Sequence, residues 1–267
     1  MSNIDTEDEE YTDEYEDYTE DDEEYTEDDG DKAALLAFYK SSGMEQHFPD
    51  RWNINEPYWN WYGVETSNDD RVTKLCCEGG LDGEIPPEIG DLRELEKLYL
   101  HYNVLKCWIP KTIGNLTKLK ILSLLRNRAI WGPIPREIGN LVNLTELNLA
   151  ENTLSGPLPP EIGKLTNLKK ITLYANRLTG PLPPEIGNLL NLKILNLDYN
   201  SFSGRLPLSV SKLTNLLYFC LQRNKVECID PDNGQLNGTD IEYLTAHFNK
   251  YSANVKTCLH GTIVGKR

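Results

Sequence analysis

The chain has 267 residues and a formal net charge of -15, and hydrophobic residues make up 39% of it. No stretch approaches the ~20 uninterrupted apolar residues that a membrane-spanning helix requires. Residues 1–31 hold 18 Asp or Glu and no Lys or Arg, which leaves 24 acidic and 27 basic side chains in the remainder. The composition therefore describes an acidic arm attached to a nearly neutral body.

Cysteine usage and the first residues bear on the compartment. The six cysteines do not form the paired Cys-x-x-Cys units of a zinc site. We expect reduced thiols that fill structural positions, because a disulfide framework requires an oxidising compartment. The first residues also lack the basic start and apolar run of a secretory signal. These features predict a cytoplasmic protein, with a nuclear location as an alternative, and they count against secretion.

Residues 1–30 form the acidic arm, which repeats Tyr-Thr-Asp or Tyr-Thr-Glu at intervals of seven residues. Aliphatic side chains are nearly absent, so the arm cannot bury enough surface to offset its ordering entropy, and we expect disorder. Thr19 and Thr26 each precede an acidic residue by three positions and are candidate phosphorylation sites. The sequence leaves three roles of the arm open: it serves solubility, it attracts a basic partner, or it contacts the body as an autoinhibitor.

Residues 31–71 are predicted to form an N-terminal cap. We expect a short helix over 31–40, with Asp31 as its N-cap, an apolar face, and Gly43 as its stop. Three tryptophans follow that are large enough to cover the open face of a first repeat: Trp52, Trp59 and Trp61.

Residues 72–231 repeat with a period near 24. The anchor is a pair of apolar residues separated by one position, as in Leu147-Asn148-Leu149, and seven units carry it or its equivalent. The alternation predicts a short strand with one buried face. An Asn such as Asn152 follows most anchors, and its carboxamide both donates and accepts, so it can satisfy backbone groups where the chain turns. Gly and Pro follow, and they predict a turn and an extended path.

The string Leu-x-x-Leu-x-Leu-x-x-Asn-x-Leu-x-Gly-x-(Ile/Leu)-Pro resembles the plant-type leucine-rich repeat over about 160 of the 267 residues. The resemblance implies an α/β repeat solenoid, a right-handed superhelix of about seven repeats. It implies a parallel sheet on the concave face and irregular or 3₁₀ segments on the other side. Cys107 and Cys228 depart from it in the Gly position, and residues 128–130 include one extra residue. A helical cap is expected at each end, because an open end would expose the shared core.

The predicted N-terminal cap resembles that of bacterial and protist members of this class, on the run Trp61-Tyr62-Gly63-Val64 and its surroundings. Secreted plant receptors usually hold this cap with two cysteines, whereas Trp59 and Thr66 stand in those places here. This departure agrees with the cytoplasmic expectation. At the other end, residues 232–267 are predicted to form a C-terminal cap and tail. Residues 239–251 have helical spacing, and a partner-binding helix is the alternative.

Side chains between and beside the anchors point away from the core and form ladders along the open face of the predicted sheet. Tyrosines in these ladders offer rigid area with a polar tip, which is typical of recognition surfaces. The residues expected to contact a partner are Lys97, Tyr99, His101, Tyr102, Arg126, Asn148, Glu151, Lys170, Thr172, Tyr174, Asn196, Asp198, Tyr199, Tyr218, Gln222 and Arg223.

These patterns predict a non-enzymatic protein-binding scaffold or recognition module, acting in signalling or regulation, with a protein or peptide ligand on the concave face. The sequence has four His and no Gly-rich phosphate loop, metal motif or nucleophile elbow, and the ladder acids Glu151 and Asp198 show no obvious pairing. We therefore expect no catalytic residue, metal or cofactor. Without a basic stripe on the body, we also expect no nucleic-acid partner.

Two other functions remain open. The arm, through residues 5–29, is a candidate binder of basic proteins such as histones. Alternatively, the chain is a secreted receptor-like or inhibitor protein. Its Asn-x-Thr sequences would then accept glycans, at Asn115, Asn143 and Asn237.

Overall fold

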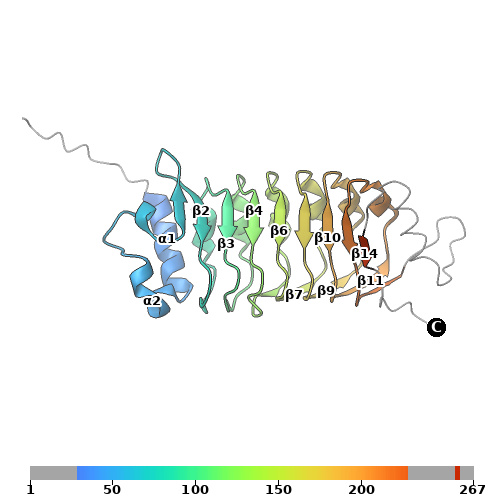
Figure 1. The fold of residues 1–267 in the computed structure, drawn as a ribbon, viewed down its shortest axis with the longest axis horizontal. Helices are drawn as coiled ribbons and strands as arrows, with labels where there is room; N and C mark the ends of the chain where they lie inside the picture. The colour runs from blue at the N-terminus through green and yellow to red at the C-terminus, as the bar shows by residue number, and fades with distance from the viewer. Residues whose placement is uncertain (1–28, 228–255, 259–267) are drawn as a thin grey trace, which may run out of the picture.

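The computed structural model describes residues 29–227 and 256–258. The chain winds into an elongated coil in which short strands lie side by side along one surface, and the N-terminal helices lie at one end (Figure 1). The predicted repeat solenoid with a parallel sheet is confirmed. Residues 1–28 of the acidic arm and the predicted C-terminal helix over 239–251 lie outside the described residues, and the domain boundaries stay predictions.

Two helices begin the described chain, α1 (Asp29–Ser41) and α2 (Met44–His47), and α1 packs against the 3₁₀ helix of the first coil. Two 3₁₀ helices follow, Pro49–Arg51 and Tyr58–Asn60. The chain then enters strand β1 (Val64–Thr66), which pairs antiparallel with β2 (Val72–Cys76). This hairpin leads the chain from the helical segment into the parallel sheet.

Asp31 is a residue of α1 rather than its predicted N-cap. Its side chain is fully buried, and its two carboxylate oxygens accept hydrogen bonds from the Arg71 guanidinium at 2.9 and 3.1 Å. One of them also accepts the backbone N–H of Val72 at 2.8 Å. A carboxylate three residues into a helix thus joins α1 to the first long strand, a contact across 40 residues that helix-capping rules do not consider.

Two of the three tryptophans expected to cover the first repeat are buried. Trp52 and Trp61 are buried, and their rings stack with centroids 4.8 Å apart. Each indole N–H donates to a backbone carbonyl, that of Tyr62 and that of Asn53 respectively. Trp59, by contrast, remains 38% exposed and does not cover the first coil as expected.

Within the described residues the large sheet has nine strands in the order β1-β2-β3-β4-β6-β8-β10-β12-β14, and every pair after the first is parallel. Equivalent residues of successive coils pair with one another, so Ile171 lies between Leu147 and Leu195. The remaining strands are β3 (Lys97–Tyr99), β4 (Ile121–Ser123), β6 (Glu146–Asn148), β8 (Lys170–Thr172), β10 (Ile194–Asn196), β12 (Tyr218–Cys220) and β14 (Lys256–Cys258).

Opposite this sheet, each coil carries a 3₁₀ helix that begins directly after a proline with extended backbone angles. The prolines therefore start the 3₁₀ turns, because their fixed φ already suits the entry to the helix. The helices are Pro87–Asp91, Lys111–Asn115, Arg136–Asn140, Pro160–Lys164, Pro184–Asn188 and Leu208–Lys212.

A second parallel sheet, which the sequence did not predict, runs along another side of the coil in the order β13-β11-β9-β7-β5. In Figure 1 its strands pass below the large sheet. Each is short and follows the Asn of its coil: β5 (Trp131–Gly132), β7 (Thr153–Gly156), β9 (Arg177–Gly180), β11 (Ser201–Arg205) and β13 (Lys225–Glu227).

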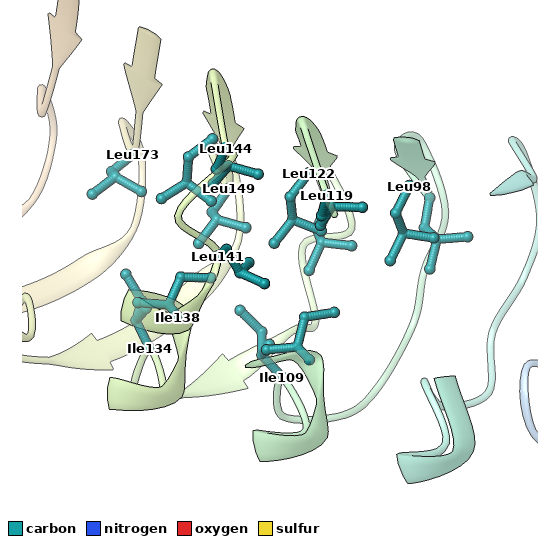
Figure 2. Packing of buried hydrophobic residues seen from close by; sticks show 14 of the residues in the cluster. Leu98, Ile109, Leu119, Leu122, Ile134, Ile138, Leu141, Leu144, Leu149 and Leu173 are labelled. Atoms are coloured by element: carbon teal, nitrogen blue, oxygen red, sulfur yellow. The ribbon is translucent and has the colours of Figure 1, made fainter. Parts of the chain in front are cut away.

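The core runs the length of the solenoid and consists mainly of aliphatic side chains, many of them from the strands and the 3₁₀ helices. Figure 2 shows Leu122 and Leu149 from the sheet facing Ile109 and Ile138 from the opposite side. All four are at most 3% exposed. No single coil could bury this surface alone, so each coil depends on its neighbours for stability.

The repeated asparagines are buried and act as predicted. Asn176 Oδ1 accepts the N–H of Leu154 at 3.0 Å, and Nδ2 donates to the carbonyls of Leu149 and Leu173 at 2.9 and 3.1 Å. One carboxamide therefore satisfies backbone groups of its own coil and of the preceding one. Asn200 makes the equivalent contacts one coil later.

Candidate protein-binding face

The outward side chains of the parallel strands, with the residues just after them, make up what we call the strand face. It includes the sixteen residues expected to contact a partner, Lys97 to Arg223 as named above. In-register pairing brings them into rows, such as Glu146 beside Lys170 and Asn148 beside Thr172. Because the rows are set by backbone pairing, each side chain has a defined neighbour in the next coil.

One of the sixteen does not reach the surface as predicted. Thr172 is 8% exposed, and its hydroxyl has no hydrogen-bond partner. Ser123 and Ala150, which lie in the same middle region of the sheet, are also buried. These short side chains lie between larger neighbours on strands about 4.8 Å apart, so the neighbours cover them. We call these three recessed positions the floor of the strand face; the half-buried Asn148 lies between Ser123 and Thr172 in the same row.

Backbone geometry at the end of each strand directs the exposed side chains, and sequence analysis missed it. The residue just before each ladder Asn has a φ near +55°, in the left-handed region that side chains with a Cβ normally avoid. The N–H of such a residue donates to the next coil, as from Tyr102 to the Leu125 carbonyl at 2.9 Å and from Tyr199 to the Gln222 carbonyl at 2.8 Å. Tyr102 and Tyr199 are held in this way with 50% and 56% of their surface exposed.

The residues in this conformation share one position in the repeat. They are Tyr102, Arg126, Glu151, Ala175, Tyr199 and Arg223. Since none is Gly and only Gly adopts this region without steric cost, no residue type in the sequence marked the position.

An aromatic cluster occupies the end of the strand face nearest the N-terminal helices. The rings of Tyr99 and His101 meet edge to face with centroids 5.8 Å apart, and His101 and Tyr102 do so at 5.3 Å. His101 Nε2 lies 2.8 Å from a Glu78 carboxylate oxygen, and the Arg126 guanidinium lies over the Tyr102 ring. Burial raises the pKa of the Tyr99 hydroxyl, so Tyr99 stays neutral.

Charged groups in the middle of the strand face are paired with one another. The Tyr174 hydroxyl donates to the Glu151 carboxylate at 3.0 Å, and Arg126 Nε lies 3.6 Å from the other oxygen of that carboxylate. Lys170 pairs with Glu146 at 2.7 Å. Glu151 therefore has the partners that sequence analysis did not find. Burial, followed by the hydrogen bond to Glu151, raises the pKa of Tyr174.

The other end of the strand face presents Tyr199 with Tyr218 and Asp198. Asp198 accepts the backbone N–H of Gln222 at 2.5 Å, so this carboxylate also has a partner in the next coil. Burial raises the pKa of Asp198, while the hydrogen bond from Gln222 opposes that rise. An Asp tied to the backbone of the next coil supports the turn there rather than serving as a free acid.

The described residues, 29–227 and 256–258, contain no group of three His, Cys, Asp or Glu side chains placed to hold a metal ion. The same part of the chain has no helix long and apolar enough to cross a membrane. What the strand face offers chemically is aromatic area and hydrogen-bonding groups in fixed rows.

The chain matches the family model described as Leucine Rich Repeat over residues 143–165, 167–189 and 191–213. It is 34% identical to a probable LRR receptor-like serine/threonine-protein kinase, RPK1, of Arabidopsis thaliana, over 38% of this chain and 24% of the relative. It is also 34% identical to polygalacturonase inhibitor 2 of the same plant, over 35% of this chain and 30% of that protein. The match thus spans under a third of either relative.

Solved structures show the same fold. A plant ice-binding protein is 30% identical, with a TM-score of 0.68, over 74% of this chain and 64% of that one. The LRR ectodomain of the membrane receptor kinase GASSHO1/SCHENGEN3 of Arabidopsis thaliana, in complex with Casparian strip integrity factor 2, has a TM-score of 0.67 at 26% identity. That match covers 86% of this chain and 30% of that one. The plant peptide hormone receptor RGFR1, in complex with RGF2, is 40% identical with a TM-score of 0.52, over 57% of this chain and 24% of that one.

Three repeats of this chain match the leucine-rich-repeat model, and the chain is similar to plant leucine-rich-repeat proteins. Its relatives include receptor-like proteins and an inhibitor, and they support the predicted class, a protein-binding module.

The predicted cytoplasmic location is wrong. The relatives are receptor-like proteins and an inhibitor, and one matching structure is a receptor ectodomain, which together point to an extracellular or secreted setting. The prediction relied on the start of the chain and on the missing cap cysteines. Trp52 and Trp61 close the N-terminal segment by ring stacking and hydrogen bonds, so that segment is held without a disulfide whatever the compartment. The proposed basic partner of the arm finds no support among these relatives.

Proposed function

We propose that the strand face binds an extended peptide segment, free or part of a larger protein, that runs across the strands. The observation that carries this proposal is the placement of two aromatic groups at the ends of a low floor. The first group is Tyr99, His101 and Tyr102, and the exposed Tyr199 alone represents the second. Tyr218 pairs with Ile194, five residues before Tyr199, and lies at the other edge of the strand face.

The distance between the two groups sets the length of the ligand. Strand β3, which carries the first group, and strand β10, which precedes Tyr199, are separated by four strand-to-strand steps in the sheet. At about 4.8 Å per step the groups lie roughly 19 Å apart, which an extended peptide spans with about six residues. The proposed ligand therefore has two apolar or aromatic anchors about six residues apart.

The electrostatics of the floor favour a ligand that is polar but nearly uncharged between its anchors. Glu151 is engaged by Arg126 and Tyr174, and Glu146 is engaged by Lys170. A charged ligand would have to break these ion pairs in order to bind their charged groups. The backbone amides of an extended peptide can form hydrogen bonds with the same side chains while the ion pairs stay intact. The relative described as a peptide hormone receptor in complex with RGF2 supports a peptide as the ligand. The proposal includes no catalytic step.

A test removes one anchor site from each group. The double variant Tyr102→Ala/Tyr199→Ala changes two exposed side chains, so it is expected to fold normally. Buried aromatic anchors commonly contribute about 2 kcal/mol or more each, so the double variant should bind at least about a hundredfold more weakly. Tyr62→Ala, an equally exposed tyrosine outside the strand face, is the control.

The probe is a phage-displayed library of random linear peptides selected on the full chain. Selection of peptides with two apolar anchors about six residues apart, bound by the Tyr62 variant but not by the double variant, supports the proposal. Selection of no peptide, or equal binding by all three proteins, overturns it.

A further inference from the structure

Two exposed tryptophans lie away from the strand face, at the end of the second sheet. Trp131 belongs to β5, the terminal strand of that sheet, and Trp108 belongs to the preceding coil. Their side chains are 49% and 60% exposed. The ring centroids are 5.2 Å apart and the ring planes are inclined by 76°, so the two indoles form an open corner.

The repeat itself does not require these indoles. Trp131 directly precedes Gly132, a position at which the following coils have Ser155, Thr179 and Ser203 before their own glycines. A Cβ built on Gly132 would lie 3.7 Å from the Trp108 Cβ. The corresponding distances in later coils are 3.6 or 3.7 Å, to Pro133, Pro157 and Pro181. Trp108 therefore occupies the position that proline takes in the later coils. The backbone follows the same path in those coils, where Pro stands in place of Trp108 and Ser or Thr in place of Trp131.

Among the described strands of the second sheet, β5 alone carries an exposed large hydrophobic side chain. Beyond β5, that sheet carries short hydroxyl side chains, with Thr153 paired to Trp131 in the register and Ser201 paired to Thr179. Lys106, in the coil of Trp108, is paired with Asp82 at 3.6 Å. Arg177 is the nearest basic residue of the sheet, one strand beyond Thr153.

From this arrangement we propose that Trp108 and Trp131 form a binding site for a neutral glycan, independent of the peptide-binding proposal. A pyranose ring has an apolar C–H face and a rim of hydroxyls. The C–H hydrogens are positively polarised and stack on the electron-rich face of an indole. The corner offers two such faces, and the adjoining sheet offers hydroxyl partners for the rim.

A protein partner fits this corner less well than a glycan. A stable protein interface buries about 800 Å² on each side and has an apolar centre. Two rings surrounded by Ser and Thr side chains supply a much smaller apolar area. The size and composition of the site thus match one or two stacked sugar rings within a longer chain.

The test measures binding of cellohexaose, a neutral β-linked glucose hexamer, to the full chain by calorimetry and tryptophan fluorescence. Trp131→Ser restores the residue found in the equivalent position of two later coils, and Trp108→Ala removes the second ring. We expect the double variant to bind at least about tenfold more weakly. Trp59→Ala, which removes an exposed tryptophan near the N-terminus, and the Tyr102/Tyr199 double variant should bind like the unchanged protein.

Three outcomes overturn the inference. The first is the absence of cellohexaose binding by the unchanged protein. The second is equal binding by the Trp108/Trp131 variant. The third is binding of an oligogalacturonate alone, in a salt-sensitive manner, which would show that basic side chains rather than stacking carry recognition. Because the Tyr102/Tyr199 variant is a control here, failure of either proposal is distinguishable from failure of the other.

Discussion

Replacing a ladder asparagine tests the central stabilising feature of the repeat, and Asn176→Ala is the clearest case. The change leaves the Leu154 N–H without its acceptor, the Asn176 Oδ1 atom. The carbonyls of Leu149 and Leu173 each lose one donor but keep another, from Asn152 and Asn200 respectively. An orphaned buried donor costs about 1 to 3 kcal/mol, and each lost additional bond about 0.5 to 1.5 kcal/mol.

We therefore expect Asn176→Ala to lower the free energy of unfolding by about 4 kcal/mol, measured by urea denaturation. Asn188→Ala, in an exposed part of a 3₁₀ helix, should change it by less than about 0.5 kcal/mol. Asn176→Asp separates the two halves of the carboxamide, because a carboxylate still accepts from Leu154 but cannot donate to the carbonyls. It should be destabilised at neutral pH at least as much as the alanine variant. A loss below about 1.5 kcal/mol for Asn176→Ala, or near-normal stability of Asn176→Asp, would refute this reasoning.

Three further predictions concern helix α1, a glycine and a tyrosine. Asp31→Asn should lower the free energy of unfolding by about 2 to 3 kcal/mol, because it leaves a partly buried guanidinium without its carboxylate; hydrogen exchange should locate the loss in α1. Gly63→Ala should lower the free energy of unfolding by well over 2 kcal/mol, because the added Cβ would lie 1.9 Å from the Cys76 carbonyl oxygen. Gly79 has a φ within 1° of that of Gly63 but open space around its Cβ position, so Gly79→Ala should lower it by only about 1 kcal/mol. Calorimetry measures both changes. Tyr174→Phe should reduce the loss of stability above pH 10, measured by denaturation across pH.

The sign of the tyrosine prediction follows from its raised pKa. An unfolded tyrosine ionises near pH 10, whereas folded Tyr174 stays protonated to higher pH because of burial and the adjacent carboxylate. Its contribution to stability is thus complete below pH 10 and is lost as the pH rises through the folded pKa. An unchanged alkaline profile in Tyr174→Phe would contradict this account, as equal costs at Gly63 and Gly79 would contradict the steric one. Normal stability of Asp31→Asn would show that its ion pair is not needed.

Most of the fold was predictable because the repeated pattern expresses local rules many times. The Leu-x-Leu alternation, the Asn and the Pro each have one conformational or hydrogen-bonding role, and the structure confirms those roles in successive coils. The strand face was predictable for the same reason, since alternation assigns outward positions. The prediction of outward positions failed at Thr172, because burial there depends on the size of the side chains in neighbouring coils and not on alternation.

Other features depended on contacts that no local pattern encodes. Asp31 resembles an N-cap in sequence, yet its carboxylate binds Arg71, 40 residues away. The left-handed residues at the strand ends are held by the next coil, so Tyr102 and Glu151 carry no signal of their own. The second sheet and strand β14 also arise from pairing between distant segments. The extracellular or secreted setting was inferred from the relatives, because the packing of the repeats does not depend on the compartment.

The sequence by itself determined that each coil has a buried aliphatic side, an asparagine turn and an outward row, because periodic burial and backbone hydrogen bonding are local requirements repeated at a constant interval. Only the tertiary structure decided which outward side chains are prominent. Stacking places Tyr102 and Tyr199 above a floor of Ser123, Ala150 and Thr172, and sets the Trp108 and Trp131 rings at a corner. The physical reason is that relative height and ring orientation depend on the neighbours in adjacent coils, which are distant along the chain.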